Sequence, residues 1–156
     1  MKIFFDTEFF ENGRTIDLIS IGMVREDGQT FYAETPSSRF LSNSTDWLRA
    51  NVLPRLQGWD GRELKNISED IILFVGDDPE FWAYYADYDW VVLCQLFGRM
   101  IDLPNGWPMY CRDLKQEADR LNIKFPKIDA SKSHNALYDA LWVKDMYYQF
   151  IIKDLK

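Results

Sequence analysis

The chain has 156 residues, of which 47% are hydrophobic, so one domain spanning residues 1–156 with a sizeable core is expected. No apolar run approaches the roughly 20 residues that a membrane-spanning helix needs. An acid at position 6 makes the N-terminus unlike a secretory signal, and a cytoplasmic location is therefore expected. The net charge of −7 argues against broad binding to duplex nucleic acid, which depends on a basic surface.

The N-terminal part of the chain predicts three strands joined by short turns. These strands span residues 2–9, 17–25 and 30–34, and a Glu-Asp-Gly-Gln turn follows the second. The first strand is apolar on both faces at its start, which is typical of a central strand covered on two sides. The three strands are expected to form an antiparallel meander.

Helical and βα patterns follow. The expected helices span residues 45–52, 63–75, 88–100, 113–121 and 135–153, and the expected strands span 81–86 and 107–111. Ser44 and Asp87 are the expected caps of the first and third of these helices, and Met100 should face inward. A meander followed by βα units predicts an α/β fold with a mixed sheet and helices on its faces.

Two acids interrupt the apolar pattern of the first strand. Asp6 and Glu8 are two residues apart, so they lie on one face of the strand, about 6.5 Å apart along it. Two carboxylates in a buried strand repel each other and lose solvation, and a cation between them would remove both costs. A strand end that emerges into water explains the pair equally well.

Two further acids stand in the apolar stripes of helices, near the helix starts. Asp89 is in register with the stripe of the 88–100 helix, and Asp139 lies one turn before Val143 in the last helix. The helix dipole also favours a carboxylate in a first turn, so a capping role is an equally good explanation of Asp89.

The single histidine precedes the last helix. His134 is five residues before Asp139, a spacing that would turn the two side chains about 140° apart in an unbroken helix. We therefore expect His134 in the loop outside the helix, with Ser133 or Asn135 as the cap. A lone histidine is more often structural or exposed than catalytic, and the sequence pattern leaves these alternatives open.

The four acids share one kind of position, at strand ends or helix starts, which is where sites form in α/β sheets. Four carboxylates suit hard cations with oxygen ligands, such as Mg²⁺ or Mn²⁺. Zinc fits less well, because one histidine and no paired cysteines leave few nitrogen or sulfur ligands. Cys94 and Cys111 are expected to be buried free thiols.

These residues resemble the DEDD superfamily of 3′→5′ exonucleases, in its histidine-bearing DEDDh branch. The first motif is Phe-Asp-Thr-Glu-Phe at 5–9, the second is Tyr-Tyr-Ala-Asp-Tyr-Asp at 84–89, and the third is His134 followed by Asp139. Two tyrosines stand where the second motif commonly has His-Asn. The chain's size and its aromatic stretch look most like the small bacterial polyadenylate-degrading exoribonucleases of that branch.

The resemblance implies a ribonuclease H-like fold with a five-stranded mixed sheet and two divalent cations, Mg²⁺ or Mn²⁺. Asp6 would bridge the ions, Glu8 and Asp139 would complete one site, and Asp89 would serve the other through water. His134 would be the general base. The implied reaction releases nucleoside 5′-monophosphates from single-stranded 3′ ends, with RNA favoured and adenylate tracts as a candidate preference.

Candidate substrate contacts lie close to the motifs, and they are Thr7, Phe9 and Lys132. Lys132 belongs to a stretch that is richer in bases than in acids, which would either attract phosphate or form a solvated surface. Trp47 and Trp59 could wedge bases, although core packing is the simpler explanation for any one aromatic.

Three alternatives compete with this hypothesis. A haloacid-dehalogenase-type phosphatase needs Asp-x-Asp in its first strand, and this chain has Glu8 instead. A non-catalytic nucleic-acid-binding module would have lost some of the five site residues, which are all present. A 3′→5′ exodeoxyribonuclease would differ in its reading of the 2′-hydroxyl, which the sequence does not disclose. Related enzymes also form homodimers, for which exposed aromatics near Trp142, Tyr147 and Tyr148 are candidates.

Overall fold

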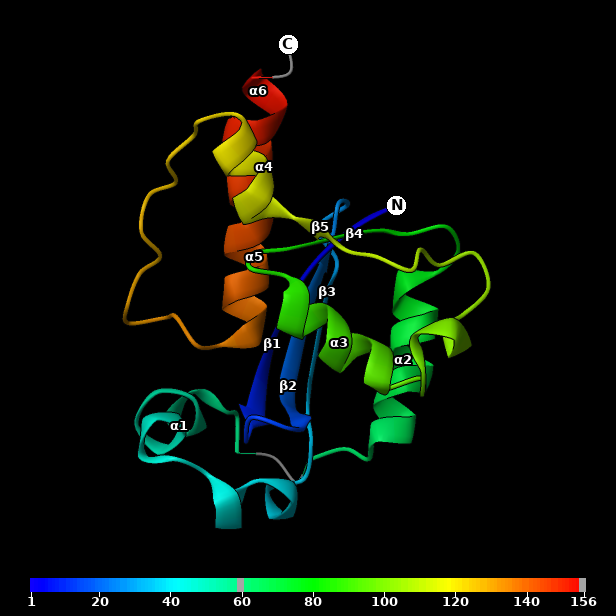
Figure 1. The fold of residues 1–156 in the computed structure, drawn as a ribbon, viewed down its shortest axis with the longest axis vertical. Helices are drawn as coiled ribbons and strands as arrows, with labels where there is room; N and C mark the ends of the chain where they lie inside the picture. Colours follow the sequence, from blue (N-terminus) through cyan, green and yellow to red (C-terminus); the bar gives the residue numbers. More distant parts are fainter. Residues whose placement is uncertain (59–60, 155–156) are drawn as a thin grey trace.

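The computed structural model describes residues 1–58 and 61–154, so Trp59 lies outside the described residues. A five-stranded mixed sheet in the order β3-β2-β1-β4-β5 forms its centre (Figure 1). The strands are β1 (Lys2–Glu11), β2 (Ile16–Arg25), β3 (Thr30–Glu34), β4 (Glu80–Ala83) and β5 (Arg112–Asp113). The predicted antiparallel meander and mixed sheet are confirmed.

The central strand β1 is paired over different lengths on its two edges. It runs antiparallel to β2 over nearly its whole length, with a bulge after Glu8, but parallel to β4 only from Lys2 to Phe4. The prediction of a strand over 81–86 was too long, because Tyr85 has a left-handed backbone (φ 57°) that turns the chain toward a helix. Beyond Phe4, this edge of β1 has no neighbouring strand among the described residues.

The strand predicted over 107–111 was wrong, because the pairing with β4 begins one residue later. Trp82 of β4 pairs with Arg112, and β5 is only two residues long. The Trp107 side chain instead packs into the core, where its indole N–H donates to the carbonyl of Gly76 at 3.0 Å. The sheet is therefore short on this side, and the second motif begins at Tyr84, directly after β4.

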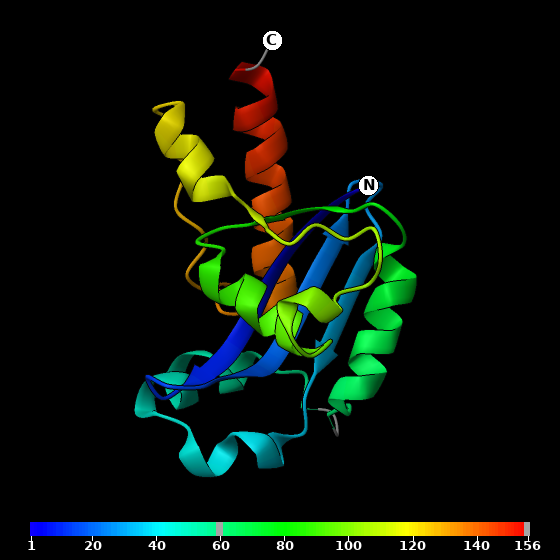
Figure 2. The same cartoon turned by 45° about the vertical axis from the view of Figure 1, so that its right-hand side comes forward.

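Two hydrophobic layers cover the sheet. The helices α2 (Leu64–Val75) and α3 (Asp87–Gln95) pack on one face, and α5 (Ala136–Met146) packs on the other (Figure 2). Ile3 and Phe5 belong to the core with α2 and α3, whereas Phe4 packs with Val143 of α5. Because side chains alternate along a strand, Asp6 and Glu8 share the α5 face with Phe4.

The C-terminal helix occupies the predicted region, with an irregularity near its end. After α5 come a π-helical turn (Tyr147–Ile151) and α6 (Ile152–Asp154), with α4 (Leu114–Arg120) beside them (Figures 1 and 2). Of the aromatics considered for self-association, Tyr147 is buried against Phe4 and Trp82, and Trp142 is half-buried. Only Tyr148 is exposed, so the expectation of an exposed cluster was wrong for the other two.

The irregular segment after β3 contains α1 (Asp46–Asn51) and 3-10 turns at Ser37–Arg39, Leu41–Asn43 and Leu53–Arg55. The cap of α1 is Thr45, whose hydroxyl accepts from the N–H of Leu48 at 3.2 Å. The prediction of Ser44 as the cap was wrong, because its hydroxyl donates to the carbonyl of Leu41. In the parts of the chain that the structure describes, no helix is long and apolar enough to cross a membrane.

Helix α3 ends earlier than predicted, and it also begins one residue earlier, at Asp87. It stops at Gln95 because Gly98 (φ 114°) breaks the helical path, and a separate 3-10 turn follows over Met100–Asp102. Met100, predicted to face inward, is therefore exposed. Asp87 is the first helical residue and Ala86 holds the cap position, so the cap prediction was off by one residue.

Candidate active site

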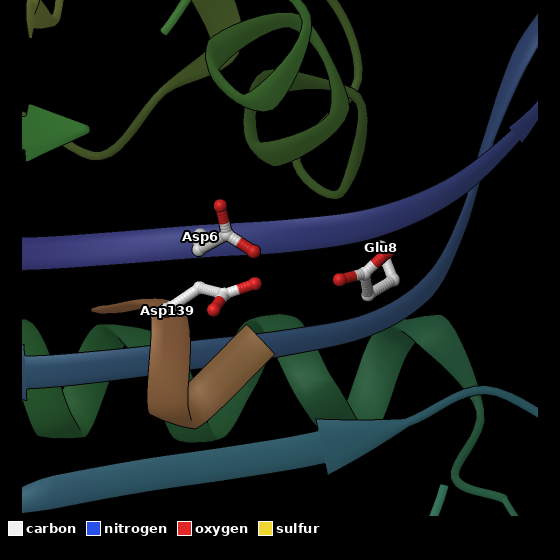
Figure 3. A group of neighbouring side chains, drawn as sticks. All are labelled: Asp6, Glu8 and Asp139. Atoms are coloured by element: carbon white, nitrogen blue, oxygen red, sulfur yellow. The ribbon is translucent and has the colours of Figure 1, made fainter. Parts of the chain in front are cut away.

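Three carboxylates from distant parts of the sequence converge at the centre of the molecule. Asp6 and Glu8 come from β1, and Asp139 comes from the first turns of α5 (Figure 3). One oxygen from each carboxylate lies within 4.8 Å of one oxygen from each of the others. Figure 3 shows the three side chains pointing toward one another. Such a group of oxygens can hold a single cation.

A glycine on the neighbouring strand allows α5 to come this close to the sheet. Gly22 pairs with Asp6 in the register of β1 and β2. A Cβ atom placed on Gly22 would lie 2.2 Å from the backbone nitrogen of Leu137, a separation that no real contact reaches. The absent side chain therefore lets the start of α5 rest on the sheet opposite Asp6. Sequence reasoning missed this role, because a glycine within a strand carries no signal of what packs against it.

Asp89 approaches the site from the other side of β1. Its Oδ1 accepts hydrogen bonds from the Thr7 backbone N–H at 2.9 Å and from the Thr7 hydroxyl at 2.5 Å. The N–H is available because β4 stops pairing with β1 at Phe4. Asp89 is 6% exposed, and its charge is one of the influences that raise the pKa of Asp6. Asp89 therefore belongs to the same electrostatic site without being one of the three converging carboxylates.

All four acids are difficult to ionise together. Burial, and then the charge of Asp89, raises the pKa of Asp6 well above its usual value. Burial, and then the charge of Asp139, raises the pKa of Glu8 to about 8. Burial raises the pKa of Asp89 to about 7 and that of Asp139 to about 6. The hydrogen bond from the His134 N–H lowers the pKa of Asp139, but burial has the larger effect. The site is therefore deficient in positive charge.

The four carboxylates have no basic partner in the part of the chain that the structure describes. No lysine or arginine among residues 1–58 and 61–154 forms an ion pair with any of the four carboxylates. Oδ1 of Asp139 is buried and has no hydrogen-bond partner in the same part of the chain. Buried carboxylate oxygens without donors are suited to a hard divalent cation, and Mg²⁺ and Mn²⁺ prefer such ligands.

His134 stands immediately before α5, outside the helix as predicted. Its backbone is left-handed (φ 62°), and its N–H donates to Oδ2 of Asp139 at 2.9 Å. The cap is Asn135, one of the two predicted candidates, whose side chain accepts from the N–H of Tyr138. Burial, with a smaller contribution from the charge of Arg55, lowers the pKa of His134. The imidazole is therefore neutral at pH 7 and able to accept a proton.

Arg55 is a further residue that the sequence did not point to. Its carbonyl accepts from the side-chain amide of Asn135 at 3.2 Å, which ties the segment after α1 to the start of α5. The ring of Trp47 in α1 meets the ring of His134 edge-on, with centroids 4.9 Å apart. Because Trp47 is 53% exposed, it presents an aromatic surface beside the imidazole.

The three predicted substrate contacts occupy different surroundings. The Thr7 hydroxyl is engaged by Asp89, so this side chain holds the acid in place. Phe9 stacks on Tyr88, with centroids 5.8 Å apart and ring planes at 26°. The ammonium of Lys132 lies 5.2 Å from the ring centroid of Tyr138.

The two cysteines are free thiols, as expected, but Cys111 is only partly buried, so the expectation of two buried thiols was wrong for this residue. Cys94 is buried, and burial raises the pKa of its thiol to about 11. Burial also raises the pKa of the Cys111 thiol well above its usual value. Both side chains therefore stay protonated at neutral pH.

The model of the Rv2179c-like 3′-5′ exoribonuclease domain family matches residues 1–151. This chain belongs to that family. The 3′-5′ exoribonuclease Rv2179c of Mycobacterium tuberculosis is 43% identical over an alignment that covers 74% of this chain and 73% of the relative. The exonuclease class predicted from the three motifs is thereby confirmed at the level of the family.

Solved structures support the fold. The Mg²⁺- and Mn²⁺-bound form of S. pombe Pop2p aligns with a TM-score of 0.59 and 15% identity over 96% of this chain and 84% of that chain. A chain in the structure of the yeast NOT1 MIF4G domain co-crystallised with CAF1 aligns with a TM-score of 0.51 and 14% identity, covering 96% and 80%. The ribonuclease H-like α/β class predicted from the sequence is confirmed.

Proposed function

We propose that residues 1–156 form a single metal-dependent 3′→5′ exoribonuclease domain that releases nucleoside 5′-monophosphates from the 3′ ends of single-stranded RNA. The observation that carries the proposal is the convergence of Asp6, Glu8 and Asp139 within 4.8 Å, with no protein cation paired to them among the described residues. Membership of an exoribonuclease family supplies the reaction type and direction.

The acids would hold two divalent cations, Mg²⁺ or Mn²⁺. Asp6, Glu8 and Asp139 would bind the first, because their oxygens already face one another. Asp89 would serve the second with the oxygen that Thr7 does not occupy. When bound, the ions would acidify the attacking water and stabilise the charge on the leaving 3′-oxygen.

His134 would be the general base. A ring nitrogen would accept the proton of the attacking water, which requires a neutral imidazole. Burial and the charge of Arg55 favour that form by lowering the pKa of His134. The bond from the His134 N–H to Asp139 would hold the base at a fixed place relative to the metal ligands.

We propose RNA rather than DNA as the substrate, because the 43% identical relative is named as an exoribonuclease. The presence of all five motif residues favours catalysis over a non-catalytic binding module. Adenylate preference, a homodimeric state and a cytoplasmic location remain predictions of the sequence. The adenylate preference would be measured by comparing the degradation rates of RNA oligomers of each base at equal concentration.

The proposal is tested by incubating the purified protein with 5′-labelled RNA and DNA oligomers of matched sequence, with Mg²⁺, with Mn²⁺ and with a chelator. We expect single-nucleotide shortening of the RNA from the 3′ end and recovery of nucleoside 5′-monophosphates, only with metal. The Asp6→Asn variant should be inactive. Glu11→Gln, at an exposed position on the same strand, is the matched control and should retain activity.

Two results would overturn the proposal. Cleavage in the middle of the oligomer would show an endonuclease, and shortening that persists in the chelator would show that the acids do not act through a metal. Faster shortening of DNA than of RNA would favour the exodeoxyribonuclease instead.

A further inference from the structure

A row of polar side chains crosses the sheet from β1 to the edge strand β3, on the face that α5 covers. Ser20 of β2 pairs with Glu8 of β1, and Glu34 of β3 pairs with Ser20. Residues directly opposite each other in antiparallel strands lie on one face, with Cβ atoms about 4.5–5.5 Å apart. All three residues are buried, and Ser20 is only 1% exposed. The hydroxyl of Ser20 therefore lies between two buried carboxylic acids.

The Ser20 hydroxyl is a donor without an acceptor. Its oxygen is buried and forms no hydrogen bond within residues 1–58 and 61–154. A buried polar group without a partner is costly, and in a native protein it calls for an explanation. An alanine would occupy the same place on the strand without this cost. The hydroxyl therefore points to an acceptor that it can reach by rotation about one side-chain torsion.

Glu34, the neighbour of Ser20 on β3, already has its donors. Its Oε1 accepts hydrogen bonds from the Tyr32 hydroxyl at 2.6 Å and from the Gln57 N–H at 2.6 Å. Burial, and then the bond to Glu34, raises the pKa of the Tyr32 phenol, and the nearby Ser20 hydroxyl acts in the opposite direction. The phenol therefore keeps its proton at neutral pH. The Glu34 carboxylate is held by β3 and by the segment after α1, and it does not depend on Ser20.

Glu8, the neighbour of Ser20 on β1, lacks a donor. In the described part of the chain, no group donates a hydrogen bond to the Glu8 carboxylate. In the view of Figure 3, this carboxylate lies between β1 and the adjoining ribbon of β2, the strand that carries Ser20. Carboxylates that bind metal ions are usually held in turn by hydrogen bonds from the surrounding protein. A free donor and a carboxylate without donors thus stand opposite each other on neighbouring strands.

We propose that Ser20 is a positioning residue for Glu8. Its hydroxyl donates to the Glu8 oxygen that does not bind the cation, and this bond fixes the carboxylate for metal binding. The inference rests on the proposed metal-dependent function and adds to it a residue outside the three motifs. Because the bond holds a metal ligand and does not touch the substrate, its loss should appear first in the affinity for the ion.

The test measures Mn²⁺ binding directly, by titration calorimetry on the full chain after treatment with a chelator. Ser20→Ala should weaken the Mn²⁺ affinity by about 10- to 100-fold, the usual cost of removing a group that holds a metal ligand. Ser20→Thr keeps the hydroxyl on a β-branched side chain, which suits a strand. Its affinity should stay within about threefold of the wild-type value, because the donor is still present.

Two comparisons separate this role from a general loss of stability. Ser68→Ala removes a buried hydroxyl from α2, which packs on the opposite face of the sheet, and should leave the Mn²⁺ affinity unchanged. In a Glu8→Ala background, Ser20→Ala should change the affinity by less than about twofold, because the acceptor is gone. Thermal melting in the presence of a chelator shows whether each variant is folded.

The outcomes are distinct. A loss of Mn²⁺ affinity in Ser20→Ala that is restored in Ser20→Thr, and that disappears in the Glu8→Ala background, supports the inference. Wild-type affinity in a folded Ser20→Ala variant, or an equal loss in both backgrounds, would overturn it even if the wild-type chain binds Mn²⁺ and shortens RNA as proposed. A wild-type chain that binds no Mn²⁺ would overturn the inference and the proposed function together.

Discussion

The backbone N–H of His134 donates a 2.9 Å hydrogen bond to Oδ2 of Asp139. The two residues of the third motif are therefore joined directly, through the main chain of one and the carboxylate of the other. The left-handed backbone of His134 aims its N–H at the start of α5. Because the imidazole takes no part in this bond, its removal should leave Asp139 in place.

Replacing His134 with alanine should therefore affect proton transfer and spare metal binding. We expect turnover to fall by about 10²- to 10⁴-fold, the usual cost of losing a general base. The Mn²⁺ concentration that gives half-maximal activity should stay within about threefold of the wild-type value. His134→Asn is the matched variant, because asparagine tolerates a left-handed backbone. Wild-type turnover in either variant would show that another group is the base.

Asp89 and Asp87 lie two residues apart at the start of α3 and should respond differently to the same substitution. Asp89 is buried and bonded to Thr7, whereas Asp87 is exposed. Asp89→Asn should lower activity at saturating metal by about tenfold or more. Asp87→Asn should change it by no more than about twofold, as for most surface substitutions. The reverse order in a steady-state assay would show that the wrong acid of the second motif was chosen.

Gly22→Ala should damage the site from a distance. The added Cβ would clash with the backbone of Leu137, so α5 must move away from β2 and carry Asp139 with it. We expect the free energy of unfolding to fall by about 1–3 kcal/mol, as for overpacked cores. Mn²⁺ affinity, measured by titration calorimetry, should weaken at the same time. An unchanged affinity in a destabilised variant would mean that the helix position does not set the ligand geometry.

Arg55 should influence the pH dependence of turnover. Its positive charge helps to lower the pKa of His134, so Arg55→Ala should raise that pKa. A general base works in its deprotonated form, and the acidic limb of kcat should therefore move to higher pH in this variant. Arg55→Lys keeps the charge and should preserve the wild-type limb. A profile that does not move in Arg55→Ala would rule out this electrostatic contribution.

The metal-free protein should lose stability as the pH rises. Burial raises the pKa values of Asp139, Asp89 and Glu8 to about 6, 7 and 8, above the value of about 4 in an unfolded chain. The folded state therefore keeps protons that the unfolded chain releases. The stability that these acids contribute is complete below about pH 4 and is lost as the pH rises through about 8.

Thermal melting with a chelator should accordingly give a lower Tm at pH 8 than at pH 5. Mg²⁺ should raise the Tm more at pH 8, because the ion competes with protons for the same oxygens. Asp6→Asn removes one of the repelling charges and should flatten the dependence without metal. A Tm that stays level between pH 5 and pH 8 would show that the acids ionise freely.

Much of this architecture follows from local sequence patterns. Alternation along residues 2–9 predicts a central strand that carries two acids on one face, and the strand and its neighbours in the meander fold accordingly. Helical periodicity places Asp139 on the inner stripe of α5, with His134 outside the helix. These features depend on the fixed repeats of strand and helix, which any sufficiently long pattern reveals.

The tertiary structure alone decided how the parts meet. Thr7 and Asp89 are 82 residues apart, and their bond exists because β4 leaves part of the β1 edge open. The short strands β4 and β5 differ from their predicted ranges because their length depends on which backbone groups find partners across the sheet. The close approach of α5 depends on the missing Cβ of Gly22. Such contacts join residues that no local repeat relates, so only the folded chain could determine them.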